Sequence, residues 1–383
     1  MRISRTMVAG VASAAVAASG LAGTALTGRH DPQGAGAGLR LNQMQVVGSH
    51  NSYHRELSPN EQKVQLQNNP GSVDLWYSHA PIDQQLEDQN VRSLELDLFP
   101  DPQGGLYTYP LIRKLTGQGP LTDPAMAQPG IKVMHVPDFD YNTNCDTFVL
   151  CLQQVKTWSD AHPNHVPIAI NLELKQSDPN VVAAGGVKAP PWNAVNLDSV
   201  DTEIRSVFTE KEILTPDDVR KPGLTLEQSV LTKGWPKLSS AHGQVMFYFD
   251  NGGPGEIRDL YTAGKPNLEG RAVFTRGPEG AADAAVTEVN DPRGANQAEI
   301  QRLVKKGYLV RTRSDEPMAT IRDKDYSRLG IALASGAQWV TTDFPVAGMA
   351  ARYDSDFVAK LPGHTPVRSN PVTATARTAV SEG

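Results

Sequence analysis

The stretch from Ser93 to Phe99 reads SLELDLF and places two acidic residues one position apart in an aliphatic run. In an extended strand the side chains alternate between faces, so the three leucines share one side while Glu95 and Asp97 share the other. Two like charges on one face repel each other and are costly to desolvate unless a cation neutralises them. The pattern therefore indicates either a strand with one solvated face or one wall of a cation site.

Outward from this stretch, short apolar runs alternate with amphipathic stretches and Pro/Gly loops, which is typical of a parallel sheet with crossover helices. We expect strands at residues 43–48, 93–99, 131–136, 167–174, 245–249, 272–276, 308–312 and 339–342. Helices are expected at residues 82–90, 147–162, 197–208, 296–306 and 321–335. Eight strands are what a closed barrel needs, so the sequence predicts a distorted TIM (β/α)8 barrel, class α/β, in a single catalytic domain.

The rest of the 383 residues is assigned to terminal segments and loops. We expect a signal peptide at 1–28, a flexible leader at 29–40, the barrel at 41–362 and a disordered tail, rich in Pro, Thr, Ser and Ala, at 363–383. Long Gly/Pro-rich connections at residues 101–128, 176–193 and 251–267 are candidates for functional or mobile loops. The net charge of −6, without a basic run, predicts no nucleic-acid partner, and we expect a monomer.

The N-terminus has the layout of a secretory signal. Arg2 and Arg5 precede a stretch of Ala, Val, Gly and Ser from residue 7 to about 25. A weak transmembrane anchor is the alternative, but these residues contribute too little hydrophobicity for a stable span, and no later segment is long enough. The sequence therefore predicts a secreted protein without an integral membrane span.

Cys145 and Cys151 are the two cysteines of the chain. Close spacing downstream of an export signal favours a local disulfide, with two unpaired buried thiols as the alternative. On one continuous helix a spacing of six would place them on poorly matched faces. We therefore expect Cys145 just ahead of the helix at 147–162 and Cys151 in its second turn.

Four successive predicted strands carry or precede residues suited to catalysis or metal binding. They are His50 and Asn51 after the first, Glu95 and Asp97 on the second, His135 at the end of the third and Glu173 on the fourth. In barrels of this type the active site lies at the C-terminal ends of the strands, where these groups fall. The oxygens of Asn51 and the three carboxylates suit a hard cation, Ca²⁺ or Mg²⁺, rather than zinc. Two imidazoles beside it can exchange protons near neutral pH.

The order His-Asn, Glu-x-Asp, His and Glu on these strands resembles the phosphoinositide-specific phospholipases C, and in particular the secreted bacterial Ca²⁺-dependent branch. The resemblance runs from about residue 43 to 344, with its specific motifs between His50 and Glu173. It implies a distorted (β/α)8 barrel with Ca²⁺ on Asn51, Glu95, Asp97 and Glu173, and with His50 and His135 flanking the phosphate. The longer interval between Asp97 and His135 implies a loop insertion after the second strand.

The implied reaction is cleavage of a phosphatidylinositol-type lipid, at a membrane surface, to diacylglycerol and an inositol phosphate through a cyclic phosphodiester. Ca²⁺ would lower the pKa of the attacking inositol hydroxyl and stabilise the charge on phosphorus. We assign His50 to phosphate contact and removal of the hydroxyl proton, and His135 to protonation of the diacylglycerol oxygen, although the two roles are interchangeable at this point.

Further candidates for substrate binding are Lys175, Arg313 and Asp343. Lys175 should share a strand face with Glu173, as a phosphate contact or a counter-ion. Arg313, which shares a face with Arg311, binds phosphate or inositol hydroxyls, or forms a salt bridge. Asp343 binds substrate or fixes a neighbouring group. We rank four other residues below these: His54, His79, Tyr248 and Asp250.

Two other functions compete with this interpretation. A glycerophosphodiester phosphodiesterase has a similar Glu-x-Asp pair and Glu-x-Lys strand, but typically follows its first His with Arg-Gly. Here Asn51 stands in that place and cannot supply a cationic fork. The second alternative is a catalytically inactive barrel that binds Ca²⁺ or inositol lipids.

Overall fold

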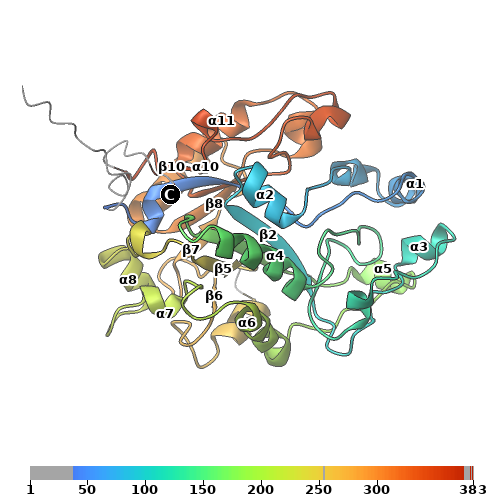
Figure 1. Ribbon diagram of the computed structural model, residues 1–383, viewed down its shortest axis with the longest axis horizontal. Coiled ribbons are helices and arrows are strands. Elements are labelled where there is room, and N and C mark those ends of the chain that lie inside the picture. Colours follow the sequence, from blue (N-terminus) through green and yellow to red (C-terminus); the bar gives the residue numbers. More distant parts are fainter. Residues whose placement is uncertain (1–37, 253–254, 375–379, 381, 383) are drawn as a thin grey trace, which may run out of the picture. The chain divides into compact units, whose positions relative to one another are not determined.

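The computed structural model describes residues 38–252, 255–374, 380 and 382. Eight parallel strands form the barrel in the order β6-β5-β4-β2-β1-β9-β8-β7 (Figure 1). They are β1 (Met44–Ser49), β2 (Ser93–Phe99), β4 (Ile168–Leu174), β5 (Val245–Phe249), β6 (Val273–Phe274), β7 (Val286–Glu288), β8 (Leu309–Arg313) and β9 (Trp339–Thr342). The predicted distorted (β/α)8 barrel is confirmed. The predicted signal peptide, 1–28, and most of the leader, 29–40, lie outside the described residues.

Helices pack around these strands, and five of them correspond to predicted ones. These five are α2 (Ile82–Asp88), α4 (Phe148–Ala161), α6 (Ala194–Val207), α10 (Ala295–Lys306) and α11 (Ser327–Ser335). The others are α1 (Pro59–Asn68), α3 (Leu111–Leu115), α5 (Pro179–Ala183), α7 (Pro216–Val219), α8 (Leu226–Thr232) and α9 (Glu256–Thr262). None of the described helices is long and apolar enough to cross a membrane.

Strand β2 is buried on both faces, which removes the alternative of a solvated acidic face. All seven of its residues are buried. The leucines pack in the main hydrophobic core with α2 and α4, while Glu95 and Asp97 stand opposite Asn171 and Glu173 of β4 in parallel register. Because paired residues of adjacent strands point to the same side, these four polar side chains face the barrel interior.

Two aromatic rings pack inside the barrel beside these polar groups. Tyr248 of β5 and Trp339 of β9 come from strands on different sides of the barrel and stack with centroids 4.7 Å apart and planes 9° apart. Both rings are buried. The interior of the barrel is therefore packed with side chains, as in other barrels of this type, and is not an open channel.

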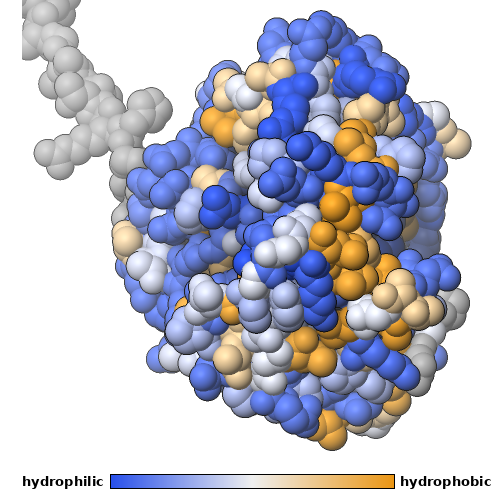
Figure 2. Space-filling view, turned by 90° about the vertical axis from the view of Figure 1, so that its right-hand side faces the viewer, coloured by the Kyte–Doolittle hydropathy of each residue, from blue (hydrophilic) through white to orange (hydrophobic). Residues whose placement is uncertain are grey.

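A second cluster of buried apolar residues, the rim cluster, lies outside the main core. Its members are Leu57, Phe99, Tyr107, Ile112, Met126, Met134 and Tyr141. Residues 99–134 supply five of its seven members, and Val187 and Ala189, from the connection after β4, pack against it. The face of the molecule that carries α1, α3 and α5 shows a band of apolar residues (Figure 2).

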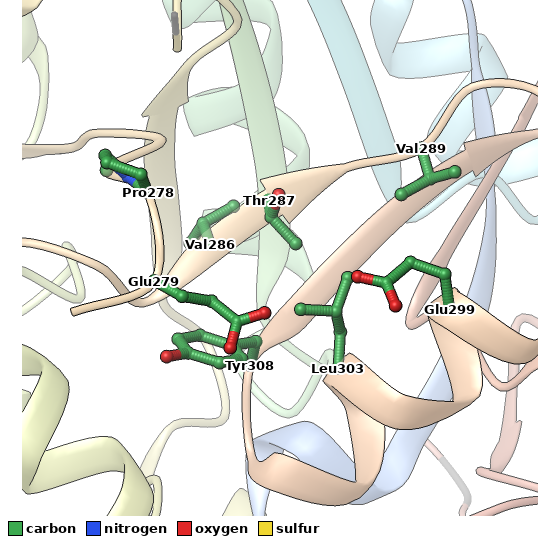
Figure 3. A pocket seen from close by; sticks show the side chains of 9 residues that line it. Pro278, Glu279, Val286, Thr287, Val289, Glu299, Leu303 and Tyr308 are labelled. Carbon is green, nitrogen blue, oxygen red and sulfur yellow. The ribbon is translucent and has the colours of Figure 1, made fainter. Parts of the chain in front are cut away.

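The barrel is not completely closed, because no backbone pairing joins β6 to β7 among the described residues. A cavity of about 190 Å³ lies at this seam, lined by Gly277 and Pro278 after β6 and by Val286 and Thr287 of β7 (Figure 3). Of its two carboxylates, Glu279 is paired with Arg302 and Lys306, and Glu299 is paired with Arg302. The cavity therefore lies where the barrel is not closed, and the carboxylates that line it already have cationic partners.

Two features of the predicted strand order were wrong. Residues 131–136 were expected to form a barrel strand, but β3 (Lys132–Val133) is a two-residue strand that pairs antiparallel with the end of β2. The eighth parallel strand is instead β7, which the sequence analysis missed because it has three residues and one of them is a glutamate. His135 consequently follows a hairpin-like return from β2 rather than a parallel strand.

The predicted disordered tail, 363–383, was wrong for the part that the structure describes. Strand β10 (Val367–Ser369) pairs antiparallel with the start of β1, and Val367 is buried. Further along, Glu382 forms a bidentate ion pair with Arg92. A single valine among Pro, Thr and Ser carries no strand pattern, so this pairing depends on the edge that β1 offers.

Gly48 permits the close approach of β1 and β2. It stands opposite Ser93, and a Cβ at this position would lie 2.6 Å from Ser93 Cβ and 2.7 Å from its carbonyl oxygen. We expect Gly48→Ala to separate the strands and to lower the free energy of unfolding by about 1–3 kcal/mol. Urea denaturation followed by circular dichroism measures this.

Gly330→Ala is the matched control for this change. Gly330 is exposed in the middle of α11, and a Cβ there meets nothing within 4 Å. Because alanine favours a helix, this variant should keep or raise the stability, by about 0.5–1 kcal/mol. A Gly48→Ala protein as stable as Gly330→Ala would contradict the close-approach argument.

Candidate active site

The loop after β1 brings His50 and Asn51 to the mouth of the barrel. Asn51 has a backbone φ of +47°, in the left-handed region that Asn tolerates better than most residues. Its side chain is buried, and Oδ1 has no hydrogen-bond partner within the described part of the chain. A buried amide oxygen without a partner is costly, so this atom is a candidate ligand for a cation.

Carboxylates from β2, β4 and the end of β5 converge beside this loop. Glu95, Glu173 and Asp250 each offer an oxygen, and these oxygens lie within 4.8 Å of one another. Asp250, which the sequence analysis ranked low, directly follows the apolar run of β5 and so occupies the position that the other carboxylates occupy on their strands. Asp97 is not a member of this group, although it stands opposite Glu173 in register.

The electrostatics of these carboxylates show the need for a cation. Burial raises the pKa of Glu95 well above its usual value, and Arg311 opposes that rise. Burial, together with the Asp97 charge, raises the pKa of Glu173 to about 7. Glu95 and Glu173 therefore favour their protonated forms more than exposed glutamates do. Burial also works against the charged Asp250, but Arg311 and Arg276 outweigh it and lower the pKa of Asp250.

Two protein cations supply part of the compensation. Arg311, fully buried on β8, forms ion pairs with Glu95 and Glu288. Lys175 Nζ lies 3.3 Å from Asp97 Oδ2 and 3.0 Å from Glu173 Oε1. Of the two roles considered for Lys175, the structure shows that of a counter-ion.

The donor set fits a hard divalent ion. Neither carboxylate oxygen of Asp97 accepts a hydrogen bond of normal geometry from the described residues. With Asn51 Oδ1, Glu95, Glu173 and Asp250, the mouth offers oxygen atoms from five side chains, and Ca²⁺ takes six to eight oxygen ligands in flexible geometry. The predicted ligands Asn51, Glu95, Asp97 and Glu173 are thus gathered at the mouth, with Asp250 added to them.

His50 is oriented by a carboxylate from the last barrel strand. Its Nδ1 lies 2.6 Å from Asp343 Oδ1, and Asp343 Oδ2 accepts a hydrogen bond from Arg313 at 2.9 Å. His50 Nε2 remains on the side of the acidic group, 4.0 Å from Glu95 Oε2. Asp343 therefore fixes a neighbouring group, as one of its two predicted roles required, and Arg313 in turn holds Asp343.

His135 is held in the same way by Asp140, a residue that the sequence analysis missed. Asp140 Oδ2 lies 2.9 Å from His135 Nδ1 and 2.9 Å from His54 Nε2. The other nitrogen of His54 faces the carbonyl oxygen of Tyr77 at 3.1 Å. Since both nitrogens of His54 face acceptors, both donate and the ring is charged.

The pKa shifts agree with this assignment. Burial disfavours the charged ring of His54, but the Asp140 charge and hydrogen bond outweigh it and raise the pKa of His54. Burial also works against the charged Asp140, but the two histidines lower the pKa of Asp140 to about 2. Asp140 is therefore an ionised carboxylate that accepts hydrogen bonds from two histidines.

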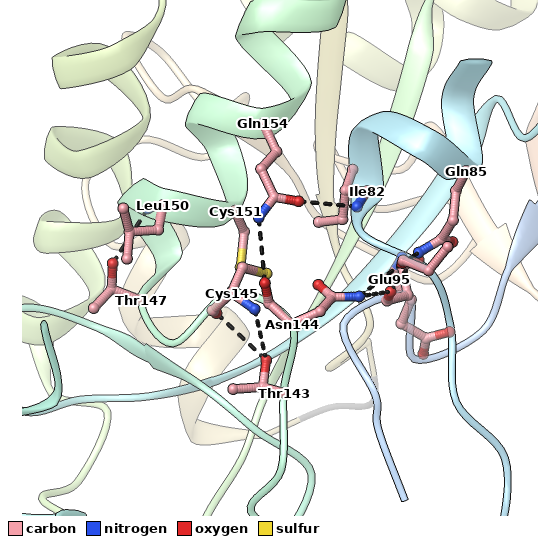
Figure 4. The surroundings of a disulfide bond; sticks show 12 residues. Ile82, Gln85, Glu95, Thr143, Asn144, Cys145, Thr147, Leu150, Cys151 and Gln154 are labelled. Atoms are coloured by element: carbon pink, nitrogen blue, oxygen red, sulfur yellow. Dashed lines mark hydrogen bonds between the residues drawn. A yellow bond between two sulfur atoms is a disulfide. The ribbon is translucent and has the colours of Figure 1, made fainter. Parts of the chain in front are cut away.

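The disulfide braces the loop that carries Asp140. Cys145 and Cys151 are bonded, with Cys145 ahead of α4 and Cys151 as its fourth residue, slightly earlier than expected (Figure 4). The neighbouring Asn144 donates to the carbonyl oxygens of Ala80 at 2.8 Å and Ser52 at 3.3 Å. The bond therefore ties the helix to the loop that follows β1 and carries Asn51.

Together, these features define a metal-assisted acid–base site at the C-terminal end of an α/β barrel. Two histidines, each with Nδ1 on a buried carboxylate, stand at a mouth lined by oxygen donors.

Comparison with known proteins identifies the family. The model of the family "Phosphoinositide phospholipase C, Ca2+-dependent" (PI-PLC-C1) matches residues 39–371. This span covers most of the chain, so the protein belongs to the Ca²⁺-dependent phosphoinositide phospholipase C family of enzymes. The comparison with curated protein sequences found no match.

Solved structures show a similar fold. The calcium-dependent phosphoinositol-specific phospholipase C of the Gram-negative bacterium Pseudomonas sp. is 18% identical in one apo form, with a TM-score of 0.53 and coverage of 88% of this chain and 97% of that chain. Its myoinositol complex is 17% identical, with a TM-score of 0.51 and the same coverage. A Ca²⁺-dependent phosphatidylinositol-specific phospholipase C from Streptomyces antibioticus is 16% identical, with a TM-score of 0.47 and coverage of 83% and 98%.

Replacement of Lys175 tests the charge balance of the mouth. Lys175→Met removes the cation between Asp97 and Glu173, so we expect the free energy of unfolding in chelator to fall by about 1–3 kcal/mol. Saturating Ca²⁺ should restore most of this loss, because the ion replaces the missing positive charge. Thermal unfolding with chelator and with Ca²⁺ measures both effects.

Lys156→Met is the control, because Lys156 lies on the outer surface of α4 and forms surface ion pairs with Asp160 and Glu212. We expect little change in either condition, as for most surface pairs. If Ca²⁺ stabilised the Lys175→Met protein no more than the wild type, Lys175 would not be a counter-ion of the metal-binding carboxylates.

Proposed function

We propose that this chain cleaves phosphatidylinositol-type lipids to diacylglycerol and an inositol phosphate through a cyclic phosphodiester, with Ca²⁺ held by Asn51, Glu95, Asp97, Glu173 and Asp250. The observation that supports this most strongly is the pair of histidines, each oriented through Nδ1 by a buried carboxylate, beside an all-oxygen cluster. Intramolecular attack on a phosphodiester needs one proton acceptor and one proton donor at such a mouth.

His50 is assigned as the base. Burial and the Arg313 charge lower the pKa of His50 to about 3, so the ring is neutral near pH 7 and Nε2 can accept a proton. A ring hydroxyl next to the phosphate attacks phosphorus while His50 Nε2 takes its proton. When bound, Ca²⁺ supplies Lewis-acid polarisation of the hydroxyl and of a phosphate oxygen.

His135 is assigned as the acid. With Nδ1 on Asp140, its Nε2 carries the proton that passes to the glycerol oxygen as the bond between phosphorus and that oxygen breaks. The preceding residue, Met134, donates its backbone N–H to the carbonyl oxygen of Asp97 at 3.2 Å, which holds the His135 loop against β2.

The two rival functions are less well supported. The matched family is that of phosphoinositide phospholipases. The glycerophosphodiester phosphodiesterases typically place an arginine at the position of Asn51, and an asparagine cannot supply the guanidinium that binds phosphate there. An inactive Ca²⁺-binding or lipid-binding barrel would have no use for two carboxylate-oriented histidines. Tight Ca²⁺ binding without product would nevertheless favour it.

We also propose that the protein is exported and works as a monomer on a membrane surface. The disulfide between Cys145 and Cys151 supports export, because such bonds persist in oxidising compartments. The signal-like residues 1–28 lie outside the described part of the chain. Mass spectrometry of the protein from culture medium would identify its mature N-terminus.

A single assay tests the reaction. Phosphatidylinositol vesicles are incubated with the protein and Ca²⁺, and then with a chelator, while phosphorus NMR follows the products. We expect a cyclic inositol phosphate signal that disappears on chelation and returns with added Ca²⁺. Turnover that survives chelation would refute the metal requirement, and turnover of glycerophosphocholine in place of phosphatidylinositol would favour the rival phosphodiesterase.

Replacement of either histidine tests the proton-transfer roles. His50→Ala and His135→Ala should each lower kcat by about 10²–10⁴-fold on phosphatidylinositol, the usual contribution of a general acid or base. His162→Ala, at a half-exposed surface position next to Glu87, is the control and should keep full activity. Near-normal turnover by either active-site variant would remove that histidine from the mechanism.

A further inference from the structure

The connection after β4 forms a groove of about 540 Å³ at the rim of the barrel mouth. Its lining includes Pro179, Val182, Ala189, Pro190, Pro191 and Lys188. It contains no carboxylate, whereas the neighbouring barrel mouth is lined by several. The face of the molecule that carries α5 also bears the apolar band of Figure 2.

Both ends of this connection are tied to Lys175, the counter-ion of the acidic cluster. The groove begins at Gln176, the next residue in the chain. At the other end, Trp192 Nε1 donates to the carbonyl oxygen of Lys175 at 2.9 Å. Between them, the Ala189 N–H donates to Ser177 Oγ at 2.9 Å and joins the two limbs. The groove is therefore anchored at the end of β4, the strand that carries Glu173.

One wall of the groove is also attached to the His135 loop. The Val187 N–H donates to Asp138 Oδ2 at 2.7 Å, and Asp138 lies between His135 and Asp140 in the chain. Gly186 packs so closely here that a Cβ would lie 2.6 Å from the same oxygen. The connection that forms the groove is thus fastened to the loop that carries His135, the acid of the proposed reaction.

Lys188 differs from the cations of the mouth in its surroundings. The four mouth cations are all paired with carboxylates, namely Lys175, Arg276, Arg311 and Arg313. Lys188 is exposed on the groove and forms no ion pair with any described residue. A largely apolar trough whose one cation is unpaired suits a ligand that has an apolar chain and oxygen acceptors at its head.

We propose that this groove binds the diacylglycerol part of the substrate, with an acyl chain against Pro179, Val182 and Pro190 and with Lys188 donating to an ester carbonyl oxygen. The inference rests on the proposed function and identifies the side on which the leaving group lies. It makes the groove a determinant of specificity for acylated over deacylated inositol phosphodiesters.

The test compares substrates with and without the diacylglycerol part. Val182→Asp places a charge in the groove, and Val195→Asp, at an exposed position of α6 that does not line the groove, is the matched control. The substrates are a short-chain phosphatidylinositol kept monomeric and a cyclic inositol phosphate, which has no glycerol. We expect Val182→Asp to lower kcat/KM on the lipid about 10–200-fold, mainly through KM, and to leave hydrolysis of the cyclic phosphate within twofold of wild type.

Lys188 is tested in the same assay. Lys188→Met should raise KM for the monomeric lipid, and Lys188→Arg should restore most of the affinity, because the guanidinium keeps a donor at this position. Lys305→Met, on the outer surface of α10, is the control. An equal loss of kcat/KM on the lipid and on the cyclic phosphate would show a structural effect and overturn the proposal. A loss of activity on phosphatidylinositol vesicles without a loss on the monomeric lipid would indicate membrane docking and would also overturn it.

Direct binding separates this inference from the proposed reaction. Calorimetric titration with dihexanoylglycerol should show binding to wild type and to Val195→Asp, and at least tenfold weaker binding to Val182→Asp. If wild type failed to cleave phosphatidylinositol but bound dihexanoylglycerol through the groove, the proposed function alone would fail. If wild type did not bind dihexanoylglycerol, the groove proposal would fail whatever the turnover.

Discussion

The buried Arg311 guanidinium is the interaction on which the inside of the barrel depends. It comes from β8 and pairs with Glu95 of β2 and Glu288 of β7, so it links strands on both sides of the interior. Breaking one side of such a pair typically costs about 3–5 kcal/mol, because the remaining charge stays buried. The same interaction opposes the rise in the pKa of Glu95 that burial causes, and it fastens β7 next to the open seam. The same buried arginine therefore both links the barrel strands and contacts a carboxylate of the metal-binding cluster.

The mouth extends this balance of charge towards solvent. Lys175 neutralises Asp97 and Glu173, Arg276 neutralises Asp250, and Arg313 neutralises Asp343. Burial still raises the pKa of Glu95 and Glu173, and a bound divalent ion would add to the compensation that the protein cations begin.

Much of this site was visible in the sequence, because its residues lie on long, regular strands. The alternation in residues 93–99 predicted β2 with its observed bounds and placed Glu95 and Asp97 on one face. Short elements were not predictable in this way. Strand β7 has three residues, and residues 131–136, although apolar, return antiparallel to β2 because the chain turns back at the rim.

Asp140 shows a second limit. It lies in a loop with no strand pattern, and its partner His54 is 86 residues away in the chain, so only the folded structure shows the shared carboxylate. Asp250 was a weaker omission, since it follows an apolar strand as Asp343 does. A position at the end of an apolar strand marks Asp250 and Asp343 as candidates in the sequence. Asp140 has no such position, so the sequence analysis missed it.

The attachment of both histidines through Nδ1 has a consequence for the catalytic cycle. Each ring has one nitrogen left, so each can hold a single exchangeable proton at the mouth. In the reaction we propose, His50 carries the proton after the first step and His135 has lost it. The attack of water on a cyclic phosphodiester requires this reversed distribution, with His135 as base and His50 as acid. Under that proposal, the second step returns both histidines to their starting protonation states without a rearrangement of the side chains.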